Sequence, residues 1–186
     1  MLKEIQKELK KLSDEKVKSS VKKFIPHLQN SYGVKMPVIN VLAKKYKDGS
    51  FEIAEQLWKS GAFEERILAA KILGKIAKKN PGRTIALIRK FSEEISDWAV
   101  CDTLGMQSPK AINSTHAKEI FSLSNELISS ENFWQRRIAI VLSEWYTRDQ
   151  SYHPQIKNLL SKVKNDKEYY VKKAVIWINR NFEKKR

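Results

Sequence analysis

The sequence has little cysteine, glycine or proline, and each shortage narrows the class of protein. Its 186 residues include a single cysteine, Cys101, so no disulfide can form within the chain and a disulfide-stapled scaffold is excluded. The first residues, MLKEIQKELKKLSDEK, contain no apolar stretch resembling a signal peptide. Both features indicate a reducing compartment, and we expect a cytoplasmic location. No segment approaches the roughly 18 uninterrupted apolar residues that cross a bilayer, so we expect a soluble protein with no membrane partner.

Negative charge is also scarce relative to positive charge. Thirty-six Lys and Arg against 21 Asp and Glu give a formal net charge of +15 and an isoelectric point near 9.8. Such an excess indicates a polyanionic partner. The chain is nevertheless 41% hydrophobic and 10% aromatic, enough to bury a core, so disorder is excluded. The length fits one domain, which we place at residues 1–186.

The apolar residues recur at intervals of three and four rather than two, which is typical of amphipathic helices. With six glycines and five prolines, few positions interrupt this pattern. We therefore predict an all-α fold with no strands. The predicted helices span residues 2–11, 14–25, 37–47, 51–59, 63–79, 82–94, 97–107, 114–129, 132–148, 154–164 and 167–183.

An internal period organises these helices. Aromatic residues open four similar segments, at Phe63, Trp98, Phe133 and Tyr169, with spacings of 35, 35 and 36 residues. One helix, a turn and a second helix fill that span, so the period indicates stacked antiparallel helical pairs. The Trp, Leu, Gly and Tyr pattern of tetratricopeptide repeats is missing. We predict a curved array of HEAT-like repeats, an α-solenoid.

The same register predicts which side chains lie side by side. Four residues after each opening aromatic come Ile67, Asp102, Arg137 and Lys173, which we expect to form one line across the concave face. Trp177 follows Lys173 by one further helical turn and shares its face. The predicted groove therefore holds one carboxylate, an adjacent guanidinium, an ammonium and large aromatics.

This combination suggests chemistry on a nucleic acid. A basic groove with aromatics can hold a phosphodiester backbone and pack against sugars or bases, but a carboxylate there opposes binding of a polyanion. Asp102 could instead stabilise positive charge developing at C1′ of a deoxyribose as an N-glycosidic bond breaks, and could orient a water. Arg137 would hold a phosphate and keep Asp102 ionised.

Other kinds of enzyme lack support in the sequence. There is no Gly-rich phosphate loop, no paired cysteines, no His-Glu-x-x-His and no Ser or Cys nucleophile with a suitably spaced histidine. The three histidines are scattered without metal-ligand spacing, so we predict no metal site and no cofactor. Trp58, Trp145 and Leu142 are expected in the core.

Several segments resemble one known family, the AlkD-type DNA alkylation repair proteins, which are HEAT-like DNA glycosylases. The resemblance runs from about Ser31 to Phe182. It is carried by Tyr32-Gly33-Val34-Lys35-Met36-Pro37, by Trp98-x-x-x-Asp102, by Asn132-Phe133-Trp134-Gln135-Arg136-Arg137 and by Tyr170-x-x-Lys173-Ala174-x-x-Trp177.

The resemblance implies base excision repair of duplex DNA, by hydrolytic release of cationic N3- or N7-alkylpurines such as 3-methyladenine and 7-methylguanine, without a metal. It implies that Trp98, Asp102, Arg137 and Trp177 are catalytic. We expect Arg136, Arg137, Lys172 and Lys173 to bind DNA. We also expect a monomer that associates with the nucleoid when DNA is bound.

A different class of function stays open on the sequence alone. The chain could be a non-catalytic HEAT-like module that binds nucleic acid or an acidic protein. In that case Asp102 would only pair with Arg137, and Trp98 and Trp177 would be core residues.

Overall fold

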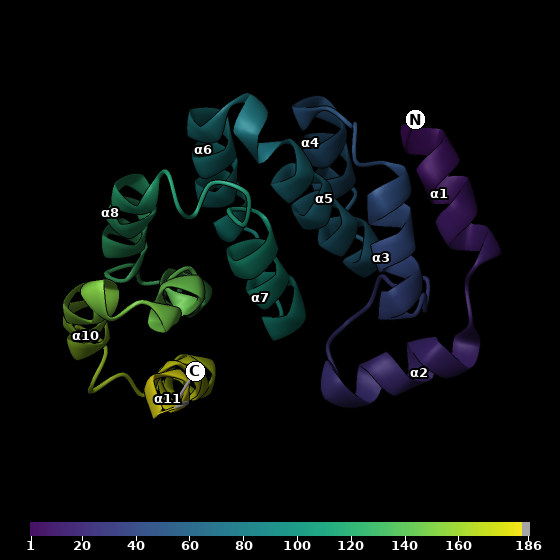
Figure 1. The fold of residues 1–186 in the computed structure, drawn as a ribbon. Helices are drawn as coiled ribbons and strands as arrows, with labels where there is room; N and C mark the ends of the chain where they lie inside the picture. The colour runs from purple at the N-terminus through teal and green to yellow at the C-terminus, as the bar shows by residue number, and fades with distance from the viewer. Residues whose placement is uncertain (184–186) are drawn as a thin grey trace.

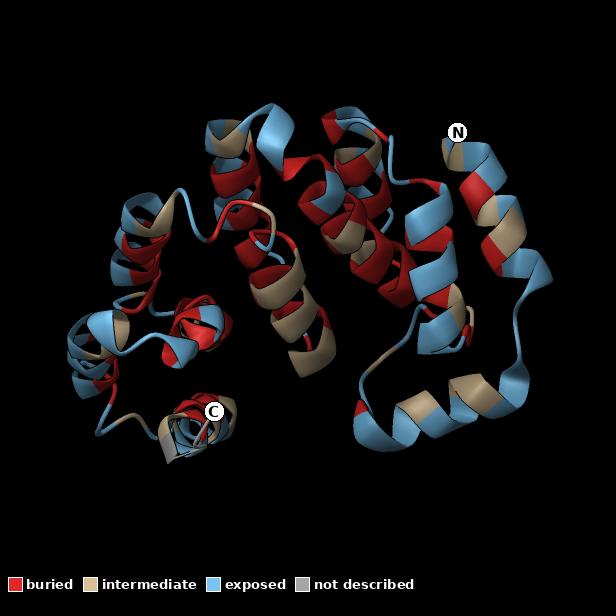
Figure 2. Cartoon of the chain, in the orientation of Figure 1, coloured by how far each residue is buried: buried red, intermediate tan, exposed pale blue. Residues whose placement is uncertain are grey.

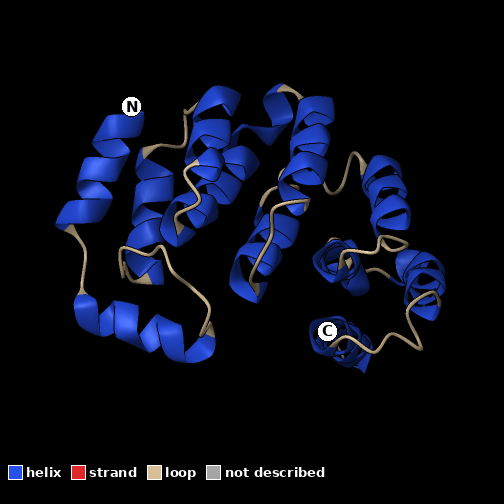
Figure 3. Cartoon of the chain, turned by 180° about the vertical axis from the view of Figure 1, so that it is seen from behind, coloured by secondary structure: helices blue, strands red, loops and turns tan. Residues whose placement is uncertain are grey.

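The computed structural model describes the fold of residues 1–183, and over that range it contains helices and loops without strands (Figure 3). This confirms the predicted all-α class. The α-helices are α1 (Leu2–Lys11), α2 (Glu15–Phe24), α3 (Met36–Lys45), α4 (Phe51–Lys59), α5 (Phe63–Ile76), α6 (Pro81–Ser92), α7 (Trp98–Gln107), α8 (Ala117–Leu127), α9 (Phe133–Val141), α10 (His153–Ser161) and α11 (Tyr169–Glu183). Short 3-10 helices are η1 (Ala77–Lys79), η2 (Glu144–Arg148) and η3 (Gln150–Tyr152). No helix in this range is long and apolar enough to cross a membrane.

The helices form two rows that bend into an arch, with α2 at one end and α11 at the other (Figure 1). In the inner row α3 packs on α5, α5 on α7, α7 on α9 and α9 on α11. The outer row lies behind it, with α4 against α5 and α8 against α9. The alternation of inner and outer helices is compatible with the predicted HEAT-like pairing.

The predicted period corresponds to the starts of the inner helices. Phe63, Trp98, Phe133 and Tyr169 are the first residues of α5, α7, α9 and α11. Side chains one residue earlier cap two of these helices, because Asp97 and Asn132 accept hydrogen bonds from backbone amides of the first turn. The repeat in the sequence is therefore a repeat of helix starts.

The buried apolar residues follow the contact between the two rows (Figure 2). Trp58 stacks on Phe91, with ring centroids 4.3 Å apart and planes 3° from parallel. Trp58 and Leu142 are buried, as predicted. The prediction for Trp145 was wrong, since 37% of this residue is exposed.

The exposure of Trp145 follows from an unexpected break in the predicted helix 132–148. Helix α9 ends at Val141 and the chain continues as η2. In that turn Tyr146 takes the core position, fully buried, and its hydroxyl donates to the Asn113 carbonyl at 2.9 Å. Neither glycine nor proline marks the break; besides this packing, the Ser143 hydroxyl donates to the Ile140 carbonyl at 2.7 Å, a local bond that competes with the helical pattern.

Two acidic residues at the start of α5 anchor the loop between α2 and α3. The buried Glu64 carboxylate accepts hydrogen bonds from the Ser31 hydroxyl at 2.8 Å and from the amides of Tyr32, Gly33 and Val34 at 2.9, 2.8 and 3.1 Å. Buried Glu65 accepts from the Tyr32 hydroxyl at 2.6 Å. These bonds fix the segment that follows α2.

The inner helices α5 and α7 approach each other closely at Gly74. A Cβ atom there would lie 2.0 Å from the Gln107 carbonyl oxygen, so even alanine would force the helices apart. We expect Gly74→Ala to lower the free energy of unfolding by about 2 kcal/mol, measured by urea denaturation. Gly82→Ala is the matched control, since its Cβ would meet nothing closer than the Asn80 side-chain oxygen at 3.7 Å. Equal stability of the two variants would contradict the close contact.

Candidate active site

Helix α7 presents a partly exposed stripe formed by Trp98, Asp102 and Met106. The positions are four apart and therefore lie on one helical face. The start of the helix is set by Asp97, whose buried carboxylate accepts from the amides of Ala99 at 2.9 Å and Val100 at 2.8 Å. This cap fixes the direction in which the stripe points.

Asp102 pairs with Arg137 of the neighbouring helix α9. The guanidinium donates from Nε to Oδ1 at 3.0 Å and from Nη2 to Oδ2 at 2.9 Å, a bidentate pair. The Arg137 side chain is 7% exposed and that of Asp102 is 22% exposed. Nη1 also donates to the Tyr170 carbonyl at 2.5 Å. These bonds use three of the five N–H groups of Arg137.

Beside this pair lies a shallow depression of about 290 Å³, lined by Trp98, Arg137, Tyr169, Tyr170 and Lys173. Tyr169 is 61% exposed, and the Lys173 ammonium lies 5.4 Å from the centre of its ring. The depression therefore combines three aromatic rings with two cations, and it lies beside the Asp102 carboxylate.

The end of α2 and the residues that follow it contact the start of α7. The Trp98 indole donates to the Phe24 carbonyl at 3.5 Å, and the His27 ring contacts the Ser96 carbonyl at 2.8 Å. The first contact joins α2 to α7, and the second joins the loop after α2 to the residues before α7. Phe24 itself is 69% exposed.

Burial raises the pKa of two neighbouring groups of α7. It raises the pKa of Asp102 above its ordinary value, and the hydrogen bonds and charge of Arg137 oppose this rise only in part. Burial also raises the pKa of the neighbouring Cys101 thiol well above its ordinary value. Because this thiol is fully buried and protonated, it is a packing residue and not a nucleophile.

The predicted line across the inner face holds for three of its four members. Asp102 and Arg137 are in contact, and Lys173 lines the same depression as Arg137. The prediction was wrong for Ile67, which is fully buried. Helix α5 is packed between α3, α4 and α7, so this part of its surface is core rather than groove.

The other predicted site residues lie outside the depression. Trp177 is partly exposed on α11 and is absent from the lining. Arg136 donates to Asp166 from Nε at 2.6 Å and to the carbonyls of Ser130 and Glu131 at 2.8 and 2.9 Å. Its side chain is 17% exposed, so Arg136 holds the loop before α11 instead of facing the groove.

Lys172 lies close enough to Asp166 for its charge to act on that carboxylate. Burial acts to raise the pKa of Asp166, but hydrogen bonds from Arg136 and from the Glu168 amide, with the charges of Arg136 and Lys172, outweigh it, and the pKa is lowered. The two Arg–Asp pairs of α9 therefore differ, because the pKa of Asp102 is raised and that of Asp166 is lowered.

Two contributions to the site had no signal in the sequence. The Tyr170 carbonyl that accepts from Arg137 and the Phe24 carbonyl that accepts from Trp98 are backbone groups, and any residue type supplies them.

Among the described residues, no three His, Cys, Asp or Glu side chains are grouped so that they could hold a metal ion.

Comparison with protein-family models gives a match over residues 5–186 to the family described as DNA alkylation repair enzyme. The chain belongs to this family. It is therefore an enzyme with a role in the repair of alkylated DNA, and DNA is its substrate. Comparison with curated proteins gave no match.

Proposed function

We propose that this DNA alkylation repair enzyme is a monofunctional glycosylase that hydrolyses the N-glycosidic bond of cationic N3- or N7-alkylpurines in duplex DNA. The observation that supports the proposal most is the Asp102 carboxylate. It is partly exposed, held by two hydrogen bonds from Arg137, and adjacent to a depression lined by aromatics and cations. A fixed negative charge in this position suits a transition state that develops positive charge.

In the proposed reaction the bond between C1′ and the base nitrogen breaks, and its electron pair leaves with the base. An alkylpurine cation is neutralised by that pair, so its departure needs no general acid. The sugar becomes an oxocarbenium-like cation, which Asp102 stabilises. Water then adds at C1′ and loses a proton, leaving an abasic site and the free base.

Arg137 has two roles in this proposal. Its Nε and Nη2 groups orient the Asp102 carboxylate and favour its ionised form. The part of its guanidinium that lines the depression, together with Lys173, would hold a phosphate beside the reacting sugar. The aromatic rings of Trp98 and Tyr169 would pack against the sugar, while Trp177 would contact the DNA further along α11.

Trp98 is expected to contribute more than Trp177, because only Trp98 lines the depression. Trp98→Ala should weaken binding to lesion-containing duplex and lower the rate of base release, each by about tenfold, as loss of an aromatic contact with a nucleotide does. Trp177→Ala should have a smaller effect on both. Fluorescence anisotropy and single-turnover kinetics measure the two quantities, with Trp98→Phe as the variant that retains a ring. Equal effects of Trp98→Ala and Trp177→Ala would contradict this ranking.

The proposal is tested by incubating the protein with duplex DNA carrying 7-methylguanine and separating the products by chromatography. Free 7-methylguanine and abasic sites are the expected products. The closed Asp102–Arg137 pair also fits a binding module in which the carboxylate is structural. Tight DNA binding without release of any base would favour that alternative.

A further inference from the structure

A second hollow lies at the carboxyl-terminal ends of α5 and α7. Its volume is about 520 Å³, and its lining includes Asn40, Lys71, Lys75, Gln107 and Lys110. The residues come from three inner helices, α3, α5 and α7, and from the loop after α7. No acidic side chain is among the lining residues.

The lysines of this hollow are uncompensated. Among the described residues, no carboxylate lies within 4 Å of the ammonium groups of Lys71, Lys75 or Lys110. Desolvation by burial, followed by repulsion from Lys110 and Lys75, lowers the pKa of Lys71. Three cations that face one hollow without a carboxylate leave a favourable place for an anion.

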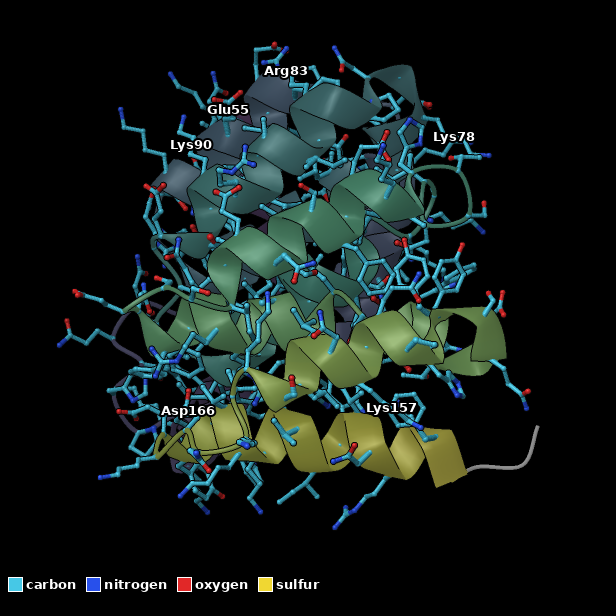
Figure 4. The ribbon with its side chains drawn as sticks, turned by 90° about the vertical axis from the view of Figure 1, so that its left-hand side faces the viewer. Glu55, Lys78, Arg83, Lys90, Lys157 and Asp166 are labelled. Atoms are coloured by element: carbon cyan, nitrogen blue, oxygen red, sulfur yellow. The ribbon has the colours of Figure 1, made fainter. Side chains whose placement is uncertain are left out.

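Cations on the outer helix α6 are arranged differently. Arg83 donates to Glu55 at 3.0 Å, and Lys90 donates to the same carboxylate at 3.3 Å. Figure 4 shows these three side chains close together. Arg89 pairs with Glu126 at 2.7 Å. These three cations of α6 are therefore compensated by carboxylates, whereas the three lysines of the hollow are not.

The hollow and the candidate active site both use residues of α7. Gln107, which lines the hollow, follows Asp102 by five residues on this helix, and Lys110 lies in the loop that comes next. At 1.5 Å per residue, Asp102 and Gln107 are about 8 Å apart along the helix axis. A few nucleotides of one strand span that distance, since successive phosphates rise by about 3.4 Å.

We propose that Lys71, Lys75 and Lys110 form an anion site that holds a phosphate group, supplied by the backbone of the DNA whose damaged nucleotide lies at Asp102. This rests on the proposed placement of DNA at Asp102. The amides of Asn40 and Gln107 are further donors to the same group. Gln107 at this site lies about 8 Å along the axis of α7 from Asp102, where the reacting sugar is placed. The site therefore positions the duplex and takes no part in bond cleavage.

The proposal predicts how DNA affinity depends on salt. Each phosphate that the protein neutralises adds about one to the slope of log affinity against log salt concentration. Lys71→Gln, Lys75→Gln and Lys110→Gln should each lower this slope for undamaged duplex by part of that amount, and the triple variant should lower it by about one, because the site holds one phosphate. Lys157→Gln is the control: it removes an exposed lysine of α10 that has no ion pair among the described residues (Figure 4) and should leave the slope unchanged.

A second titration identifies the source of the phosphate group. Inorganic phosphate is added to the protein without DNA, and thermal stability is followed for the wild type and the triple variant. If phosphate stabilises only the wild type while the DNA slopes of the two proteins agree, the ligand is a free phosphate and the assignment to DNA is overturned. If the slopes agree and phosphate has no effect on either protein, the anion site itself is overturned.

The test is independent of the glycosylase chemistry. The salt slopes are measured on undamaged duplex, so they do not depend on the release of a base. If the wild type releases no base, the proposed chemistry fails while the salt slopes still decide on the anion site. Lys75 and Lys110 are exposed, so their single variants report on binding even if the change at half-buried Lys71 disturbs folding.

Discussion

Replacing Asp102 with asparagine is expected to lower the single-turnover rate of 7-methylguanine release by roughly ten- to a thousandfold. The carboxylate acts on charge that develops only in the transition state, so its loss reduces the rate more than binding. DNA affinity should be equal or higher, because a negative charge leaves the basic groove. Rates are measured at saturating enzyme and affinity by anisotropy on the same duplex.

Asp166→Asn is the matched control for this change. Asp166 also accepts two hydrogen bonds from an arginine of α9, at 2.6 and 3.4 Å, but it lies outside the depression. Both variants should lose stability, whereas only Asp102→Asn should lose rate. A full rate for Asp102→Asn, or equal losses of rate for the two variants, would show that the carboxylate is structural.

Replacing Arg137 with glutamine is expected to change both stability and pH dependence. The change leaves a mostly buried carboxylate without its cation, which should lower the free energy of unfolding by about 3 kcal/mol. Burial raises the pKa of Asp102 and Arg137 opposes that rise, so without Arg137 the pKa climbs further. Since the reaction needs ionised Asp102, the rate should begin to fall at a higher pH than in the wild type as the solution is acidified.

The measurement is a pH profile of single-turnover base release, corrected for spontaneous loss of the base from DNA without enzyme. Arg137→Lys retains a positive charge and should return part of the profile toward that of the wild type. A purely structural Arg137 would reduce the rate equally at every pH. If the rate of both variants falls at the same acid pH as that of the wild type, the proposed effect of Arg137 on the pKa of Asp102 is contradicted.

Much of the fold could be predicted because its signals are local. The inner helices begin at aromatics spaced by about 35 residues, and capping residues such as Asp97 and Asn132 precede two of them. The end of α9 at Val141 could not be predicted in this way. It depends on the burial of Tyr146 and its bond to the Asn113 carbonyl, which lies 33 residues earlier.

The Asp102–Arg137 contact could be anticipated because both residues occupy equivalent positions on adjacent helices of a repeat array. The same reasoning failed for Ile67, whose helix is enclosed by its neighbours. It also had no means of finding Asp166, which reaches Arg136 from a loop outside the period. Lys75 and Lys110 are also equivalent positions, 35 residues apart, but they form no motif with Lys71 that indicates a shared hollow.

The most direct test of the proposed chemistry follows the alkyl group itself. Duplex DNA labelled in the methyl group of 7-methylguanine is incubated with the wild-type protein, and the released label and the abasic sites are counted. We predict that all released label remains attached to free 7-methylguanine, with one abasic site for each base released and no strand break before alkali treatment. Label that leaves without its base, with guanine left in an intact strand, would contradict cleavage of the N-glycosidic bond.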